Sequence, residues 1–359
     1  MKKNTNLRDL VDIKRKRGNC DRNIFEDICI DRNERAYPFS EDVKRGILEK
    51  IAQCSLSHYP DVEKYYSKLE NWVELDRNCL FITEGVSGAI KMVYEAFGSP
   101  GKNVVIPYPT FALYSIYPNL YNIGSRKILY KRDHTINEEE FFEKVDSNTF
   151  AVFVANPDMP VEHFFDLSYV RHLAEHLLEK GVLLIIDEVY FSFGAPTAKN
   201  LIGEFENIIV LRSFSKAFGL AGIRFGFMMS QQHIIERISK YRSGYEVSTT
   251  NGEIASFFME NPEIVDNYVS TIKTSLTWLK QKLLDKGFIV YGGNVSNYLF
   301  VELGETFIVD SIQTQLKKRN IHIRSGWLPP FDTGITVSGS SQEHMEQFHK
   351  NFIALQFND

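Results

Sequence analysis

One lysine of this sequence stands among hydroxyl groups and glycines. Residues 213–224 read Ser-Phe-Ser-Lys-Ala-Phe-Gly-Leu-Ala-Gly-Ile-Arg, directly after the apolar run at 208–211. Lysine is the side chain that forms Schiff bases with carbonyl compounds such as pyridoxal phosphate. The hydroxyls of Ser213 and Ser215 and the planar guanidinium of Arg224 can donate hydrogen bonds to a phosphate group. The stretch therefore indicates a covalently held aldehyde cofactor, with Lys216 as its point of attachment.

A carboxylate at the end of another apolar run is the second candidate. Asp187 closes the run at 182–186, and Tyr190 follows three residues later. A carboxylate at the end of a buried strand is costly unless it is paired, and the protonated nitrogen of a pyridine ring is a suitable partner. With that proton held, the ring can accept electrons from a substrate carbanion, and Tyr190 could hydrogen-bond its phenolic oxygen. Alternatively, Asp187 caps a helix and Tyr190 belongs to the core; the presence of Lys216 favours the cofactor site.

Three other segments that follow apolar runs carry candidate cofactor contacts. Gly85, Val86 and Ser87 lie in a strand-to-helix turn, where backbone N–H groups can bind an anion. A plain turn is the alternative. Phe111 could stack on a planar cofactor or belong to the core. Asn156 could support the oxygen of the cofactor ring or only shape its turn.

The bulk composition favours a well-packed enzyme over a nucleic-acid-binding or membrane protein. The 359 residues are 43% hydrophobic and 13% aromatic and carry a formal net charge of −5. The basic run at residues 14–17 has no second cluster to join it and is interpreted as a solvated helical arm. The N-terminus lacks the apolar segment of a secretory signal, and no run approaches the length of a membrane span. These features predict a cytoplasmic protein.

The cysteines and histidines show no pattern of a metal site or a disulfide framework. The four cysteines form no CxxC pair. His172 and His176 have helical i,i+4 spacing but lack the glutamate of an HExxH motif. We therefore expect these histidines to be surface or packing residues and no metal to be bound.

Short apolar runs alternate with amphipathic stretches through the middle of the chain. Continuous hydrophobicity predicts strands covered on both faces at residues 80–83, 103–106, 150–155, 182–187, 208–211 and 224–229. Helices are expected at residues 87–97, 167–180 and 231–240. This alternation predicts a mostly parallel α/β sheet, in which ligands bind beyond the carboxyl ends of the strands.

The pattern changes at about residue 251. A long helix is expected at residues 263–286, followed by strands at 288–290, 298–302 and 336–338. We therefore divide the chain into an N-terminal arm that joins the smaller unit (1–48), a large cofactor-binding domain (49–250) and a small α+β C-terminal domain (251–359).

Together these residues resemble the fold-type I pyridoxal-phosphate enzymes of the class I/II aminotransferases, nearest to the histidinol-phosphate aminotransferases. The resemblance runs from the Asp-Arg-Asn-Glu segment at 31–34 to the final helix. Its most specific parts are the lysine stretch and the Asp-Glu-Val-Tyr segment at 187–190. It implies a mostly parallel seven-stranded sheet in the large domain, a smaller α+β domain, and pyridoxal 5'-phosphate as cofactor.

The resemblance also implies roles for single residues. Lys216 holds the cofactor and then acts as general base and acid, Asp187 pairs with the pyridine nitrogen, and Tyr190 pairs with the phenolate oxygen. Phe111 takes the place of the stacking aromatic residue. The residues implied around the cofactor phosphate are Gly85, Val86, Ser87, Ser213 and Arg224.

The resemblance further implies a second subunit and a set of substrate-binding arginines. The segment at 58–61, His-Tyr-Pro-Asp, is similar to a family segment whose tyrosine reaches the phosphate in the neighbouring subunit. A homodimer follows, with Tyr59 contributed to the partner's site. Arg324 matches a family arginine, and Arg35 and Arg242 lie in segments that approach the substrate in relatives. Any of the three could bind a carboxylate or phosphate.

Two positions depart from the family pattern. Aligned without gaps, Met159 stands where the segment Asn-Pro-x-Asn-Pro-Thr-Gly has the asparagine that touches the ring oxygen, and a thioether cannot donate a hydrogen bond. Gly334 replaces the arginine of Arg-(Ile/Val)-Thr-(Ile/Val)-Gly, which clamps a substrate anion. Ring support then falls on Tyr190, and histidinol phosphate is not assumed as the substrate.

Three functions are open at this point. The first is an aminotransferase that moves an amino group between a donor amino acid and a small carbonyl or amine substrate, phosphate esters included. The second is a decarboxylase of a phosphorylated amino acid, because the same ring stabilises either carbanion. The third is a non-catalytic regulatory protein on the same fold, against which the intact Lys216, Asp187, Tyr190 and Arg224 argue. The first is the hypothesis that we carry forward, with small molecules and no nucleic acid or membrane as partners.

Overall fold

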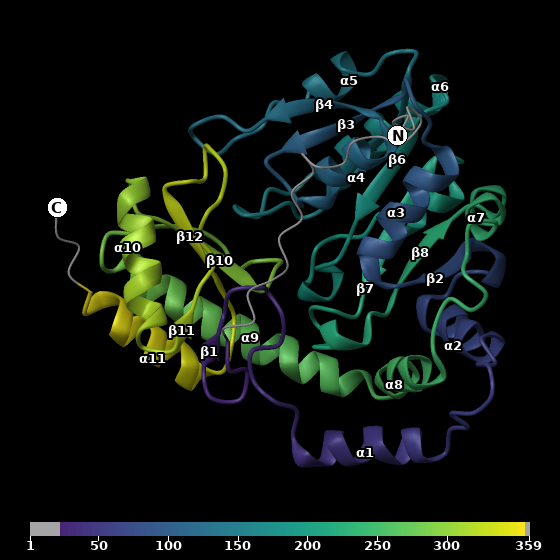
Figure 1. Ribbon diagram of the computed structural model, residues 1–359. Helices are drawn as coiled ribbons and strands as arrows, with labels where there is room; N and C mark the ends of the chain where they lie inside the picture. Colours follow the sequence, from purple (N-terminus) through teal and green to yellow (C-terminus); the bar gives the residue numbers. More distant parts are fainter. Residues whose placement is uncertain (1–21, 356–359) are drawn as a thin grey trace, which may run out of the picture.

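The computed structural model describes residues 22–355. The predictions made for the basic run at residues 14–17 lie outside these residues. Within them, a seven-stranded sheet forms the centre of the larger part of the molecule (Figure 1). Its order is β2-β8-β7-β6-β5-β3-β4, and all strands run parallel except β8, which is antiparallel to both of its neighbours. The predicted mostly parallel sheet is confirmed. The bounds are β2 Leu80–Thr83, β3 Asn103–Tyr108, β4 Gly124–Leu129, β5 Thr149–Ala155, β6 Leu183–Asp187, β7 Ile208–Ser213 and β8 Gly226–Ser230.

Six of these strands coincide with the predicted apolar runs, whereas no pattern predicts β4. Strand β4 lies at the edge of the sheet, and Ile128 is its one buried residue. An edge strand with a solvated face needs no apolar run, so the sequence carries no signal for it.

Helices cover both faces of the sheet. Alternate side chains of every strand except β4 enter two separate clusters of the core, as Ala151 and Phe153 do on one face and Val152 and Val154 on the other. Helices α3 (Gly85–Phe97), α4 (Leu113–Tyr121) and α7 (Gln232–Ser239) pack on the first face. Helices α2 (Glu63–Val73) and α6 (Leu167–Glu179) pack on the second, and α8 (Thr249–Glu260) packs against α2. The remaining short elements here are α1 Glu41–Ala52, α5 Glu140–Glu143, η1 Arg77–Cys79, η2 Phe191–Phe193, η3 Lys199–Gly203 and η4 Ala221–Ile223.

The C-terminal part is built around a smaller antiparallel sheet of order β12-β10-β9, with bounds Gly334–Ser338, Tyr298–Glu302 and Ile289–Gly292. The long helix α9 (Pro262–Leu284) packs on it with α10 (Thr306–Lys317) and α11 (Gln342–Ile353) (Figure 1). The N-terminal strand β1 (Ile28–Cys29) pairs in parallel with β11 (Ile321–His322), so residues before α1 join this part. The domain boundaries at 48/49 and 250/251 stay predictions.

None of the helices within residues 22–355 combines the length and the apolar character that crossing a membrane requires. In the same residues no group of three or more His, Cys, Asp or Glu side chains is arranged to hold a metal ion.

Candidate active site

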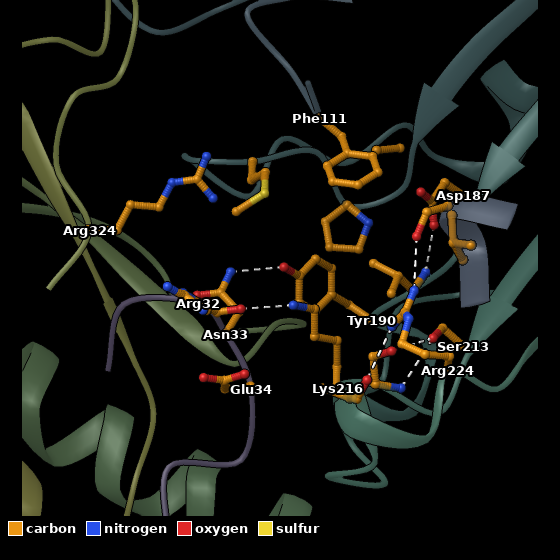
Figure 2. A pocket seen from close by; sticks show the side chains of 18 residues that line it. Arg32, Asn33, Glu34, Phe111, Asp187, Tyr190, Ser213, Lys216, Arg224 and Arg324 are labelled. Carbon is orange, nitrogen blue, oxygen red and sulfur yellow. Dashed lines mark hydrogen bonds between the residues drawn. The ribbon is translucent and has the colours of Figure 1, made fainter. Parts of the chain in front are cut away.

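A cavity of about 290 Å³ lies at the carboxyl edge of the seven-stranded sheet. Residues that follow β2, β3, β5, β6 and β7 line one side of it, and the segment at 32–34 together with Arg324 lines the other. Figure 2 shows Tyr190 and Lys216 between these two sides. Carboxyl ends of parallel strands meet at one edge of a sheet, which is why side chains from five separate strands converge here, the polar ones following β2, β6 and β7.

The amine of Lys216 points into this cavity. Its Nζ donates a hydrogen bond to the carbonyl oxygen of Arg32 at 2.9 Å. Burial lowers the pKa of Lys216 to about 8, and the negative charges of Glu34 and Asp187 offset this effect only in part. A larger share of this amine is therefore neutral near pH 7 than in an ordinary lysine. The neutral amine is the form that attacks a carbonyl carbon.

Asp187 ends β6 with its carboxylate buried at the wall of the cavity. Its Oδ2 accepts a hydrogen bond from the Tyr114 hydroxyl at 2.9 Å, and its Oδ1 accepts one from the Val189 N–H at 3.1 Å. Burial raises the pKa of Asp187 to about 6, against the effect of these two hydrogen bonds. Within residues 22–355 no side chain forms a salt bridge with it. A cationic ligand group would therefore find a buried carboxylate that is free to pair with it.

Hydroxyls, a guanidinium and a helix N-terminus gather at one end of the cavity. The Arg224 guanidinium donates to Ser87 Oγ at 2.9 Å, and the hydroxyls of Ser213 and Ser215 lie 2.8 Å apart. Among the described residues no side chain caps the N-terminus of α3, where Val86 and Ser87 line the cavity. Free backbone N–H groups and the helix dipole favour an anion at this point. The arrangement is suited to a phosphate group.

Glycine at position 85 lets this turn approach Arg224. Gly85 has φ +68°, and a Cβ there would lie 2.8 Å from a guanidinium nitrogen of Arg224. A Cβ on Gly226 would lie 2.6 Å from Gly85 Cα. Gly85 itself does not line the cavity, so its part in the site is to make room for Arg224 and to orient the start of α3.

Tyr190 and Asn33 form a buried pair at the centre of the site. The Asn33 Nδ2 donates to the Tyr190 hydroxyl at 2.9 Å (Figure 2), and Asn33 Oδ1 accepts from Ser338 Oγ at 2.8 Å. Asn33 has φ +55°, a conformation that asparagine tolerates better than most residues. Because the Tyr190 oxygen already accepts a hydrogen bond, its own O–H proton is available to a ligand oxygen.

Of Phe111, Met159 and Asn156, the first two line the cavity and the third does not. Phe111 lines the cavity, is 37% exposed, and meets Tyr114 edge-on, which leaves a ring face free. Met159 also lines the cavity. The side chain of Asn156 exchanges hydrogen bonds with the backbone of Phe165, at 2.9 and 3.0 Å, and does not line the cavity, so its contact with the cofactor ring stays a prediction. Asn156 shapes the turn, which is the alternative that the sequence left open.

Of the three arginines proposed for the substrate, the cavity contains Arg324. Its guanidinium lies 3.8 Å from the ring centroid of Trp327 and takes part in no salt bridge with a described residue. Arg35 is not in the cavity, because three aromatic rings hold its guanidinium carbon at 4.3–4.5 Å. Arg242 is more than half exposed, faces Glu246, and lies outside the cavity of its own chain. The structure therefore does not bring Arg35 and Arg242 to this site.

The room beside Gly334 is filled by an aromatic ring. A Cβ at this position would lie 2.2 Å from Cζ of Phe300, and Phe300 is fully buried. Phe300 packs against Phe331 and His134. An arginine at position 334 would therefore require Phe300 to move.

Tyr59 does not reach the cavity of its own chain. It is 81% exposed, and its ring stacks on Tyr245 with the centroids 4.7 Å apart. Whether it contributes to a partner's site stays a prediction.

The comparisons with known proteins agree with this geometry. The sequence profile of the family "Aminotransferase class I and II" matches residues 40–352. The chain belongs to this family. It is 28% identical over 301 residues to a histidinol-phosphate aminotransferase of Caldanaerobacter subterraneus subsp. tengcongensis, covering 82% of this chain and 83% of that protein. It is 27% identical over 278 residues to one of Pyrococcus furiosus, covering 77% of this chain and 79% of that protein.

Solved aminotransferases share the fold. A histidinol-phosphate aminotransferase of Sinorhizobium meliloti, solved in complex with pyridoxal-5'-phosphate, superposes with a TM-score of 0.83 at 20% identity over 91% of each chain. One from Clostridium acetobutylicum superposes with a TM-score of 0.81 at 20% identity, covering 90% of this chain and 98% of that one. The fold-type I architecture and the resemblance to class I/II aminotransferases are confirmed, and this protein is a pyridoxal-phosphate-dependent aminotransferase. The decarboxylase and the regulatory protein are not favoured.

The residues of the cavity fit this cofactor. The anion site around Arg224 suits the phosphate, the buried carboxylate of Asp187 suits the ring nitrogen, and the free O–H of Tyr190 suits the ring oxygen. The amine of Lys216 lies in the same cavity.

Some residues of the site were not among those predicted from the sequence. Arg32, Asn33 and Glu34 line the cavity. The polar run that they form directly after the apolar segment at 28–30 is the signal that could have pointed to them. Tyr114, the partner of Asp187, has no such signal: it lies on α4 at 0% exposure, indistinguishable in sequence from a core tyrosine.

Proposed function

We propose that this aminotransferase exchanges amino groups between small amines and carbonyl compounds that carry one anionic group, and that Arg324 binds that group. The observation that carries the proposal is the unpaired guanidinium of Arg324, which faces the cavity across from the Lys216 amine (Figure 2). A guanidinium binds a carboxylate or a phosphate monoester through parallel hydrogen bonds. The curated relatives act, by their names, on histidinol phosphate, which is a phosphate monoester.

The loss of a second guanidinium limits the charge of the substrate. Gly334 stands where an arginine is expected, and Phe300 fills the adjoining space. Arg324 would bind one anionic group of a substrate, and a second anionic group would lack a buried cation near Gly334. The other arginine on this wall of the cavity is Arg32, whose side chain is 39% exposed. A buried, unpaired anion is strongly disfavoured.

In this proposal each residue of the cavity acts on a defined atom. Pyridoxal phosphate, when bound, supplies the ring that accepts electrons and carries the amino group between the two substrates. Lys216 attaches the cofactor and, once released, moves a proton to and from the substrate carbon. Asp187 keeps the ring nitrogen protonated, and Tyr190 donates to the ring oxygen. Phe111 holds the plane of the ring from one face.

We further propose a homodimer in which Tyr59 enters the partner's site. Tyr59 is 81% exposed, and Leu48 and Leu56 near it in sequence are 65% and 73% exposed. Helix α1 has no buried residue. Exposed apolar side chains concentrated in one segment are typical of a protein interface. The three free cysteines among the described residues support a reducing compartment, such as the cytoplasm.

Spectra of the half-reaction test the proposal. The purified protein, loaded with pyridoxal phosphate, is mixed with a panel of amines that carry no anion, one carboxylate, one phosphate monoester or two anionic groups. We expect the absorbance of the Lys216-bound cofactor to be lost fastest with the monoanionic amines. The variant Lys216→Ala should lack both this absorbance and turnover. Undiminished turnover in Lys216→Ala, or a preference for dianionic amines, would refute the respective part of the proposal.

A further inference from the structure

Glu162 is a buried residue in a backbone conformation that favours glycine. Its φ is +60°, in the left-handed region that residues with a Cβ enter only at a cost. Its side chain is buried, although glutamate is rarely buried without a partner. Such a strained position persists only where the surrounding contacts hold it.

Those contacts come from one turn of the C-terminal sheet. The Glu162 carboxylate accepts hydrogen bonds from the Asn294 N–H at 3.0 Å, from Asn294 Nδ2 at 2.9 Å, from the Val295 N–H at 2.9 Å, and from the Ser296 hydroxyl. All the donors belong to the connection between β9 and β10. Within residues 22–355 no salt bridge neutralises this carboxylate. Two backbone N–H groups, one side-chain amide and one hydroxyl therefore satisfy this buried carboxylate.

On the side of the large sheet, Glu162 belongs to a tight loop that forms a wall of the cavity. The backbones of Asp158 and His163 pair through two hydrogen bonds of 2.7 and 3.0 Å, which close the loop. Pro157 and Met159 of this loop line the cavity. A displacement of Glu162 is therefore transmitted to the cavity wall over only a few residues.

On the other side, the turn leads directly to the opposite wall. The Asn297 Nδ2 donates to the backbone oxygen of Asn33 at 3.0 Å. Strand β10 follows the turn and pairs with β12, and Thr336 of β12 exchanges backbone hydrogen bonds with Arg324 at 2.8 and 3.1 Å. The turn that Glu162 binds thus connects to both Asn33 and Arg324.

We propose that Glu162 is a positioning residue, which joins the Met159 loop to the β9–β10 turn and so sets where Arg324 stands across the cavity. The proposal rests on the proposed role of Arg324 in binding the anion of the substrate. Glu162 touches neither substrate nor cofactor in this scheme, because it does not line the cavity. It acts by fixing the distance between two walls that carry different parts of the site.

The test uses the holoprotein, in which the cofactor phosphate already fills the site around Arg224. The variants are Glu162→Gly, which suits the left-handed backbone, and Glu162→Gln, which keeps the size but loses the charge; Ser296→Ala removes one donor from the other side. Glu204→Gln is the matched control, since this exposed carboxylate pairs with Arg171 far from the cavity. Inorganic phosphate serves as the probe, and amide hydrogen exchange of Asn294 and Val295 is followed in each variant.

We expect both Glu162 variants to bind inorganic phosphate about tenfold more weakly, the lower end of what a charge-assisted hydrogen bond contributes, with cofactor affinity unchanged. The exchange of the two amides should accelerate by a similar factor. Added to Arg324→Ala, Glu162→Gly should weaken phosphate binding no further, because its effect passes through Arg324.

Two outcomes separate the inference from the proposed function. If Arg324→Ala binds phosphate as the unmodified protein does, Arg324 is not the anion site and the proposed function fails. If Arg324→Ala weakens binding but the Glu162 variants match Glu204→Gln in both phosphate binding and amide exchange, the positioning role of Glu162 is overturned and the proposed function stands.

Discussion

Replacing Asp187 by asparagine is expected to change the stability of the apoprotein in a way that depends on pH. Burial raises the pKa of this carboxyl from 3.8 to about 6. A raised carboxyl pKa means that the folded protein binds the proton more tightly than the unfolded chain does. The stabilisation from this proton is fully present below pH 3.8 and is lost as the pH rises through about 6. At neutral pH the ionised Asp187 is therefore a destabilising group.

The magnitude follows from the two pKa values. Between pH 4.5 and 7.5, the unmodified apoprotein should lose about 2 kcal/mol of stability through Asp187 alone. The Asp187→Asn variant has no proton to bind, so its unfolding free energy lacks this component. The asparagine also changes the hydrogen bonds with Tyr114 and Val189, but that change does not vary with pH and cancels when two pH values are compared.

The assay is urea unfolding of both apoproteins at several pH values, followed by tryptophan fluorescence. The difference in unfolding free energy should shift in favour of Asp187→Asn by about 2 kcal/mol from the acidic to the neutral end. Asp166→Asn is the control: hydrogen bonds from Ser168 and Tyr169 lower the pKa of Asp166 from 3.8, so it is ionised in both states and its effect should stay nearly constant between pH 4.5 and 7.5. A difference that stays constant with pH, or that favours the unmodified protein at pH 7.5, would refute the reasoning. With cofactor present, the same variant should lose turnover.

Further predictions concern the other groups of the cavity. Tyr114→Phe removes the hydroxyl that lowers the pKa of Asp187, so this pKa should rise by about one unit. The lowest pH at which the apoprotein binds the cofactor should then move to higher pH. If this pH limit is unchanged, Tyr114 does not have this role. The pKa of Lys216 is lowered to about 8, so an amine-specific acylating reagent should modify this residue in the apoprotein with a midpoint near pH 8. Peptide mass spectrometry measures the extent of modification at each pH. A midpoint near that of surface lysines would be inconsistent with the burial of Lys216. Gly334→Arg alone should destabilise the protein, because its side chain collides with Phe300. The double variant Gly334→Arg/Phe300→Ala should recover stability and accept dianionic amines, and a double variant no more stable than Gly334→Arg would count against this packing.

The central sheet is predictable from sequence because a strand that is buried on both faces is a continuous run of apolar residues. The strands from β2 to β8 that are buried on both faces all coincide with such runs. Strand β4 is not predictable in this way, since at the edge of the sheet its pairing with β3 depends on backbone hydrogen bonds rather than on its side chains.

The wall of the cavity at the edge of the large sheet was predictable for the same reason. Asp187, Ser213 and Lys216 follow apolar runs directly, so the order of elements places them at one edge. Asn156 follows β5 in the same way, yet its side chain turns back to Phe165. Sequence position fixes the edge on which a residue lies, but the direction of its side chain depends on turn geometry that no run of residue types records.

The departures from the family pattern gather where the large sheet meets the C-terminal part. Met159 cannot donate a hydrogen bond to a ring oxygen. Tyr190, which lines the same cavity, accepts a hydrogen bond from Asn33. Phe300 fills the space beside Gly334, and Glu162, where the family segment ends in glycine, binds the turn after β9. Tyr190 and Glu162 contact segments more than a hundred residues away, and Phe300 contacts a neighbouring strand of the C-terminal sheet. The residues around Lys216 and Arg224, by contrast, keep the family pattern. In the proposed arrangement the substrate would meet the C-terminal wall and the cofactor the sheet, so these departures bear on the substrate rather than on the cofactor.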